Sequence, residues 1–438
     1  MKRTLFRLCA TIGCAAALTL VAFAQSTPQK ALSDINAARV AASTEARQNN
    51  RQVDIAALNA RIKEIANEAI GSRTVAHTEA KEAYDWAQVF TEAGRHEEAC
   101  ELCEKFLTTN PDPQAKFRAQ SLMLRNCATL GEAHMIAMVL PSVTPPDANS
   151  SSSLISNTVY LYLDIVEKEE GPAAALRLLD QVAAKAVYED VDVLAKRNWE
   201  AVKRQMQQQG QTIPEDEAAE IAKLRPRAEA TLIQQKFTIV EKRAELLSNM
   251  GQRPEAIKLL KEYAAAIDPA SPAANTVKMA VTRTELVGAP AKPFTVGKTI
   301  GEFKSIESLK GKVVLVDFFA HWCGPCIAAF PDMIKMYNDL HDKGLEIVGV
   351  TRYYGYYGSE RNLAPEVEFA KVIEFKDQHK LPWPVAYVEP TDFTAYGITG
   401  IPTIAVIDRQ GNVHSLKIGY SADSFAKFRK EVEALLSK

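Results

Sequence analysis

Two hydrophobic patterns divide the chain near Val287. Before this residue the sequence is rich in Ala, Glu, Gln, Lys and Leu and has few β-branched runs, which favours helices. After it, two β-branched apolar runs, Val313–Val316 and Ile404–Ile407, alternate with helical stretches, as in a domain with a buried sheet. The patterns predict an all-helical region over 25–287 followed by an α/β domain over 288–438.

Within the helical region, the spacing of apolar residues and glycines indicates how helices are arranged. One apolar stripe follows 3,4,3,4 spacing: Ile55, Leu58, Ile62, Ile65 and Ala69. Glycines that could end the first helix of successive hairpins recur about every 39 residues: Gly94, Gly131, Gly171, Gly210 and Gly251. The composition of 141–153 predicts a loop.

Two of these units resemble the tetratricopeptide (TPR) repeat, in which small residues let paired helices approach closely. The first carries the positions Ala83, Trp86, Ala87, Phe90, Ala99, Cys103, Phe106 and Pro111. The second carries Ala244, Leu247, Gly251, Ala256, Leu260 and Tyr263. We therefore expect a degenerate TPR-like solenoid, with an irregular helical bundle as the alternative.

In the α/β domain, three further segments have clear patterns. A helical stretch runs from Pro331 to His341, and Arg409–Asn412 predicts the turn of a hairpin. The segment Ala422–Ser437 predicts a closing amphipathic helix.

The first 24 residues have the pattern of a secretory signal peptide. A basic start at Lys2 and Arg3 precedes an apolar stretch from Leu8 to Leu20, and small residues at Ala22 and Ala24 predict cleavage before Gln25. We therefore expect the mature protein to be periplasmic or otherwise extracytoplasmic. A lipoprotein attached through Cys14 and an uncleaved membrane anchor are the alternatives, so membrane attachment through the leader stays open.

Composition and charge narrow the class of protein. With 47% hydrophobic and 24% charged residues, the 438-residue chain is globular, which excludes collagen-like and wholly disordered classes. The net charge is −2, and removal of three leader cations would make it more negative. The charge therefore gives no indication that the protein binds nucleic acid.

Cys323 and Cys326 carry the most specific candidate chemistry in the chain. They follow the Val313–Val316 run directly, and a helical run begins behind them. A thiolate is the nucleophile in disulfide exchange, and the N–H groups of a helix N-terminus stabilise it. A second thiol two residues further on can resolve the mixed disulfide. An inert disulfide or half of a zinc site is disfavoured, because this domain holds no second Cys-x-x-Cys or His pair.

Around these cysteines the sequence resembles the thioredoxin superfamily. The segment Val316–Cys326 looks like the family's active-site strand and loop, Pro331 like its helix kink, and Tyr396–Thr403 like the segment with the cis-proline. The stretch from Gly288 to Lys312 resembles the longer exported reductases of the TlpA and ResA type.

One departure from those exported relatives affects the expected chemistry. They commonly have a glutamate three residues after the second cysteine and an asparagine on the strand, where this chain has Ala329 and Asp317. Asp317 therefore looks like the buried acid of thioredoxin.

The resemblance implies a role for each site residue. Cys323 would be the attacking thiolate, Cys326 the buried resolving thiol, and Asp317 the base for Cys326, acting through water. Trp322, Ile401 and Pro402 would bind the substrate, with Pro402 cis and the Ile401 backbone facing an extended segment. No cofactor is expected beyond the redox-active Cys323–Cys326 disulfide, and neighbouring His321 is expected to be solvated.

Two other clusters have open interpretations. His96, Cys100 and Cys103 share one helix face and could hold a metal, although buried core cysteines are the commoner outcome. A bridge from either cysteine to Cys127 is a further alternative. The aromatic run Tyr353–Gly358 follows a strand and predicts either a wall for a partner or a loop that packs on itself.

Together these features predict an extracytoplasmic thiol:disulfide oxidoreductase. The resemblance of Gly324-Pro325, Ile401 and Asp317 to thioredoxin implies that it works in the reductive direction. It would act on client proteins with disulfides and take electrons from a membrane donor of the DsbD type, while its helical region recruits or orients a partner. The alternatives are a helical scaffold whose redox site only switches binding, and a peroxiredoxin-like peroxidase. The peroxidase is disfavoured because its Pro-x-x-x-Thr-x-x-Cys pattern is missing before Cys323.

Overall fold

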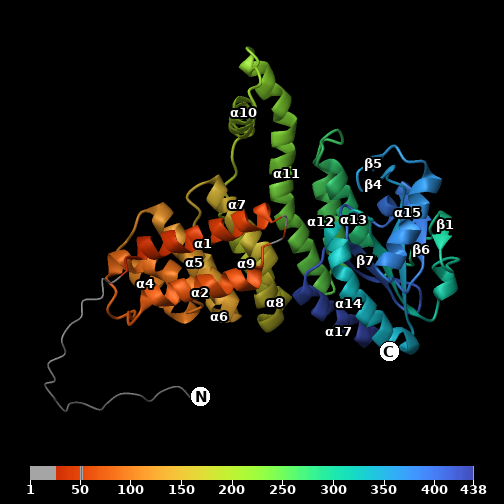
Figure 1. Cartoon of the computed structure of the whole chain (residues 1–438), viewed down its shortest axis with the longest axis horizontal. Coiled ribbons are helices and arrows are strands. Elements are labelled where there is room, and N and C mark those ends of the chain that lie inside the picture. Colours follow the sequence, from red (N-terminus) through yellow and green to blue (C-terminus); the bar gives the residue numbers. More distant parts are fainter. Residues whose placement is uncertain (1–25, 50, 52, 438) are drawn as a thin grey trace. The chain divides into compact units, whose positions relative to one another are not determined.

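The computed structural model describes residues 26–49, 51 and 53–437 (Figure 1). The predicted signal peptide, including Cys14 and the cleavage position, lies outside the described residues. No helix among the described residues is long and apolar enough to cross a membrane. The chain separates into two compact units, one ending at Pro146 and the other beginning at Asp147, which are described in turn.

Among the residues that the structure describes, the first unit contains helices and no strands. Several of its helices begin at a residue whose side chain accepts a hydrogen bond from the first turn, as Asp112 does from the Ala115 N–H (2.9 Å). The predicted apolar stripe falls in α2, where Ile62 is buried and Leu58, Ile65 and Ala69 are partly buried, but Ile55 is exposed. The helices are α1 (Pro28–Gln48), α2 (Ile55–Ile70), α3 (Ala83–Glu92), α4 (His96–Leu107), α5 (Pro113–Leu130) and α6 (Ala133–Val139).

The second unit begins with seven helices. They are α7 (Ala148–Asn157), α8 (Leu163–Glu170), α9 (Pro172–Ala183), α10 (Val191–Gln208), α11 (Glu217–Asn249), α12 (Arg253–Ala265) and α13 (Ala274–Leu286). The prediction of a loop over 141–153 is wrong in its second half, because α7 begins at Ala148. Asp147 caps this helix by accepting a hydrogen bond from the Ser150 N–H.

The regularly spaced glycines do follow helices. All five have positive φ, between 66° and 86°, a conformation that glycine adopts without the steric cost other residues incur. Helix lengths are uneven, however: α10 has 18 residues and α11 has 33. The degenerate TPR-like solenoid therefore stays a prediction, whereas the helical character of the region is confirmed.

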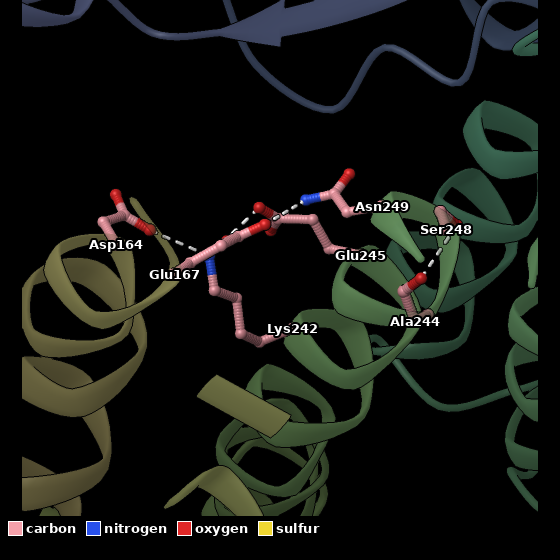
Figure 2. Close-up of polar contacts among 7 residues, drawn as sticks. All are labelled: Asp164, Glu167, Lys242, Ala244, Glu245, Ser248 and Asn249. Atoms are coloured by element: carbon pink, nitrogen blue, oxygen red, sulfur yellow. Dashed lines mark hydrogen bonds and ion pairs between the residues drawn. The ribbon is translucent and has the colours of Figure 1, made fainter. Parts of the chain in front are cut away.

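A buried lysine ties α11 to α8 (Figure 2). The Lys242 ammonium group donates to Asp164 Oδ1 of α8 (2.9 Å) and to Glu245 Oε1 on its own helix (3.0 Å). Further along α11, Asn249 Nδ2 donates to Glu167 Oε1 (2.6 Å). Because a buried cation needs such partners, this network fixes the position of α11 against α8.

A six-stranded sheet follows, in the order β1-β6-β3-β2-β7-β8. The central strands β2, β3 and β6 are parallel, while β1, β7 and β8 run antiparallel to their neighbours. The strands are β1 (Val296–Ile300), β2 (Val313–Phe318), β3 (Leu345–Thr351), β6 (Val385–Val388), β7 (Thr403–Ile407) and β8 (Val413–Ile418). The predicted turn at Arg409–Asn412 joins β7 to β8, as expected.

Helices cover both faces of this sheet. On one face, Val313 and Leu315 of β2 pack in a core with α14 (Gly324–Leu340), α15 (Pro365–Gln378) and α17 (Ala422–Leu436). On the other face, Val314, Val316 and Phe318 pack with α16 (Pro390–Ala395) and with Leu286 of α13. The last helix of the predicted helical region thus contributes to the core of the sheet domain.

Candidate redox site

The two cysteines of the Cys-Gly-Pro-Cys motif lie where β2 gives way to α14. Cys323 is the N-cap of α14, and its sulfur accepts a hydrogen bond from the Cys326 N–H at 3.2 Å. The two sulfurs form a disulfide, and both residues are almost fully buried, with 3% of Cys323 and 1% of Cys326 exposed. Since the positive end of a helix dipole points at Cys323 Sγ, reduction would leave this sulfur where a thiolate is stabilised.

Asp317 lies on the same face of the sheet as the cysteines. Alternate residues of a strand share a face, and Asp317 alternates with Val313 and Leu315, whose core cluster includes Cys323 and Cys326. The side chain is buried, and no described residue forms a hydrogen bond with its Oδ1. Burial raises the pKa of Asp317 from 3.8 to about 7. The carboxyl group can therefore exchange a proton near neutral pH.

The segment Ile401–Pro402 lies beside the cysteines because of strand pairing. Thr403, the first residue of β7, pairs with Phe318, the last residue of β2, whose chain continues into the active-site loop. The Ile401–Pro402 peptide bond is cis. Ile401 is partly buried and packs against the cluster that holds both cysteines.

Aromatic residues pack around Trp322, the residue before Cys323. Trp322 is 46% exposed, with its ring stacked on Tyr356 (centroids 6.4 Å apart) and edge-on to Tyr354 (5.3 Å). The Tyr356–Tyr357 pair forms a short strand, β4 (Tyr356–Tyr357), which pairs with β5 (Glu360–Arg361). The tyrosine run thus packs on the active-site loop and on itself, while Trp322 keeps an exposed ring.

The expectation that His321 is solvated is wrong. Only 8% of His321 is exposed, because Tyr357 stacks on its ring at 4.8 Å while Tyr354 and Tyr356 pack against it edge-on. Burial lowers the pKa of His321, which favours the neutral imidazole. Sequence reasoning missed this arrangement because the covering tyrosines come from a loop after the next strand.

A buried carboxylate that the sequence did not reveal anchors the tyrosine loop. Glu368 of α15 is fully buried and accepts hydrogen bonds from the Tyr354 N–H (2.9 Å) and the Gly355 N–H (2.7 Å). Its Oε1 also lies 3.8 Å from His321 Nε2. As one glutamate among several charged residues of a helix, it carries no sequence signal that sets it apart.

The cysteines of the first unit form a separate cluster. His96 Nδ1 is hydrogen-bonded to Asn126 Oδ1 (2.7 Å), and Cys100 Sγ lies 3.9 Å from Cys127 Sγ. Among the described residues of this unit, Cys100, Cys103 and Cys127 are free and buried. Across the described residues, no group of three or more His, Cys, Asp or Glu side chains is placed to hold a metal.

Comparisons with known proteins agree on the last third of the chain. The Redoxin family model matches residues 286–436. Thiol-disulfide oxidoreductase ResA from Bacillus cereus is 32% identical over 134 residues, which cover 30% of this chain and 70% of that protein. Thioredoxin-like protein YneN from Bacillus subtilis (strain 168) is 28% identical over 132 residues, 30% of this chain and 71% of that protein.

Solved structures align with the same part of the chain. A thiol:disulfide interchange protein of the thioredoxin family from Chlorobium tepidum TLS is 33% identical, and the alignment covers 34% of this chain and 96% of that one with a TM-score of 0.27. The assignment to a family rests on the sequence relatives, because the match to ResA covers more than two thirds of that protein. The chain belongs to the ResA-like thiol-disulfide oxidoreductases of the thioredoxin superfamily.

Proposed function

We propose that the protein is an extracytoplasmic protein-disulfide reductase that uses the Cys323–Cys326 dithiol. The observation that carries the proposal is the position of Cys323 at the start of α14, in the same core cluster as Ile401. The signal-peptide pattern of residues 1–24 supports the location. Cys323–Cys326 would be the redox-active group, with no other cofactor.

The reaction proceeds in two exchange steps that move two electrons to the client. The Cys323 thiolate attacks one sulfur of the client disulfide, forms a mixed disulfide and releases the first client thiolate. Cys326 then loses its proton to the Asp317 carboxylate through water and attacks Cys323 Sγ. The Cys323–Cys326 disulfide forms, and the second client sulfur leaves as a thiolate, which takes up a proton.

Three residues form the proposed client-binding surface. The backbone of Ile401, next to Pro402, lies alongside an extended client segment, and the exposed ring of Trp322 packs against its side chains. The packing of Trp322 on Tyr354 and Tyr356 supports this role, because it holds the indole in place before a client arrives.

Two partners complete the cycle. Each turnover leaves Cys323–Cys326 oxidised, so an electron donor is required, for which we propose a membrane reductase of the DsbD type. The helical region, which we propose stacks as TPR-like pairs, would recruit or orient the client protein, since such arrays form binding surfaces without chemistry of their own.

Reduction of insulin disulfides with dithiothreitol as electron source tests the proposal. The wild-type protein should accelerate reduction, and Cys323→Ser should abolish the acceleration. Cys326→Ser should accumulate stable mixed disulfides with clients, because its Cys323 still attacks a client disulfide but no second thiol resolves the product. Equal activity of wild type and Cys323→Ser would refute the assignment of the site.

A further inference from the structure

One arginine of the helical region reaches into the redox domain. Arg283 of α13 is buried, and its Nη1 donates to the carbonyl oxygen of Gly397 at 2.7 Å. The same nitrogen lies 3.5 Å from Thr399 Oγ1. Gly397 and Thr399 belong to the loop between α16 and β7, which ends in Ile401 and Pro402.

The backbone of Gly397 is fitted closely against α13. Its φ is +67°, and a Cβ atom added there would lie 2.6 Å from the Met279 carbonyl oxygen and 2.7 Å from Arg283 Cγ. A side chain at this position would therefore collide with the backbone of α13. The loop and the helix touch at a point where only glycine fits.

The guanidinium group of Arg283 is held from its other side by α11. Arg283 Nη2 pairs with Glu241 Oε1 at 2.7 Å. Glu241 precedes Lys242, whose buried network fixes α11 against α8 (Figure 2). A planar guanidinium with two partners has a defined orientation, so the Gly397 carbonyl meets a donor that is already in place.

The other end of the same loop is held within the sheet domain. Thr403 Oγ1 donates to the Gly400 carbonyl oxygen at 2.7 Å, and the Gly419 N–H donates to the Pro402 carbonyl oxygen at 2.8 Å. The segment Gly397–Pro402 is thus fixed at one end by its own domain and at the other by α13.

We propose that Arg283 is a positioning residue for the client-binding segment. Through the Gly397 carbonyl it sets the position of Ile401 and Pro402, so that α11 and α13 form part of the catalytic unit for protein disulfides. The inference rests on the proposed function, because it concerns how the same site holds a client. A small disulfide that engages only Cys323 does not depend on this contact.

Steady-state kinetics of the full-length protein test the role of Arg283. Arg283→Met removes the guanidinium, and with it the contacts to Gly397, Thr399 and Glu241, but keeps much of the apolar stem. KM for insulin should therefore rise about tenfold, the effect of losing a hydrogen bond to a charged group. The rate with a small disulfide, cystine dimethyl ester, and the reduction potential of Cys323–Cys326 should stay at wild-type values.

Three variants serve as controls. Arg283→Lys keeps one donor for Gly397 and should restore most of the lost affinity. Glu241→Gln removes the charge of one partner of the guanidinium but keeps an acceptor oxygen, and should raise KM about twofold to threefold. Arg243→Met removes an ion pair of α11 with Asp180 elsewhere in the helical region and should leave KM unchanged.

The outcomes separate the two proposals. If the wild-type protein does not reduce insulin, the proposed function fails. If the wild-type protein is active, two results would refute the positioning role. One is a KM for insulin of Arg283→Met equal to that of wild type, and the other is a loss of small-disulfide activity as large as the loss with insulin. If Arg283→Met does not fold, the other two variants test the same role. KM should rise from wild type to Arg283→Lys and further to Glu241→Gln, and equal KM values for the three proteins would overturn the role.

Discussion

The buried carboxyl group of Asp317 should make the sheet domain less stable as pH rises. In the unfolded chain this group ionises near pH 3.8, whereas burial in the folded domain raises its pKa to about 7. Between these values the folded state retains a proton that the unfolded state has lost. The contribution of Asp317 to the free energy of unfolding therefore falls as pH rises from about 4 to about 7 and is constant above pH 7.

The size of this effect follows from the two pKa values. Each pH unit between them is worth about 1.36 kcal/mol, so an ionised Asp317 costs the folded state about 4 kcal/mol at pH 8. Asp317→Asn removes the ionisation and adds a buried amide whose cost does not change with pH. The advantage of the variant over wild type should therefore grow by about 3 kcal/mol between pH 4.5 and pH 8.

Amide hydrogen exchange as a function of denaturant measures this difference within the sheet domain. Peptides that cover β2 and β7 report its unfolding separately from that of the helices, and the Cys323–Cys326 disulfide is kept oxidised throughout. Asp342→Asn, at an exposed carboxylate, serves as the control and should change stability by less than about 0.5 kcal/mol at both pH values. An advantage of Asp317→Asn that is the same at pH 4.5 and pH 8 would refute the reasoning.

Three further predictions concern kinetics, the helical region and its thiols. Asp317→Asn should slow resolution of mixed disulfides at neutral pH more than their formation, and stopped-flow rates in which both steps slow equally would contradict its role as base. Lys242→Met should lower the free energy of unfolding by about 1–2 kcal/mol. This is less than the loss of a fully buried ion pair, because the carboxylate partners of Lys242 are half exposed. An unchanged denaturant midpoint would exclude this contribution. Mild oxidation with diamide should join Cys100 to Cys127, because their sulfurs are 3.9 Å apart and the hydrogen bond with Cys100 lowers the pKa of Cys127. Cys103 should stay a thiol, since burial raises its pKa to about 12. A Cys103 disulfide in peptide mapping would show that the helices pack differently.

Local pattern was enough to predict the elements of the redox domain. The apolar runs at Val313–Val316 and Ile404–Ile407 are the strands β2 and β7, and they are neighbours in the sheet. Because β2 leads straight into Cys323, the sequence also predicted which helix end would meet the cysteines. These features depend on residues that are close together in the chain, where periodicity and motif spacing carry information.

Contacts between distant segments were not predictable in this way. Arg283 and Gly397 are far apart in sequence and carry no shared pattern, so their hydrogen bond follows only from the packing of α13 on the sheet domain. The same holds for His321, whose solvation was misjudged because its cover comes from the tyrosine loop that Glu368 anchors. In the helical region, glycine spacing located helix ends, but the 33-residue length of α11 had no signal in the repeat pattern.

The reduction potential of Cys323–Cys326 tests the central claim of a reductase most directly. The pair is equilibrated in dithiothreitol redox buffers, alkylated and quantified by mass spectrometry of its own peptide, which separates it from Cys100, Cys103 and Cys127. We expect a potential near that of thioredoxin, about −270 mV, because the dithiol gives electrons to protein disulfides. A potential near −120 mV, typical of a strong oxidant, would contradict the claim.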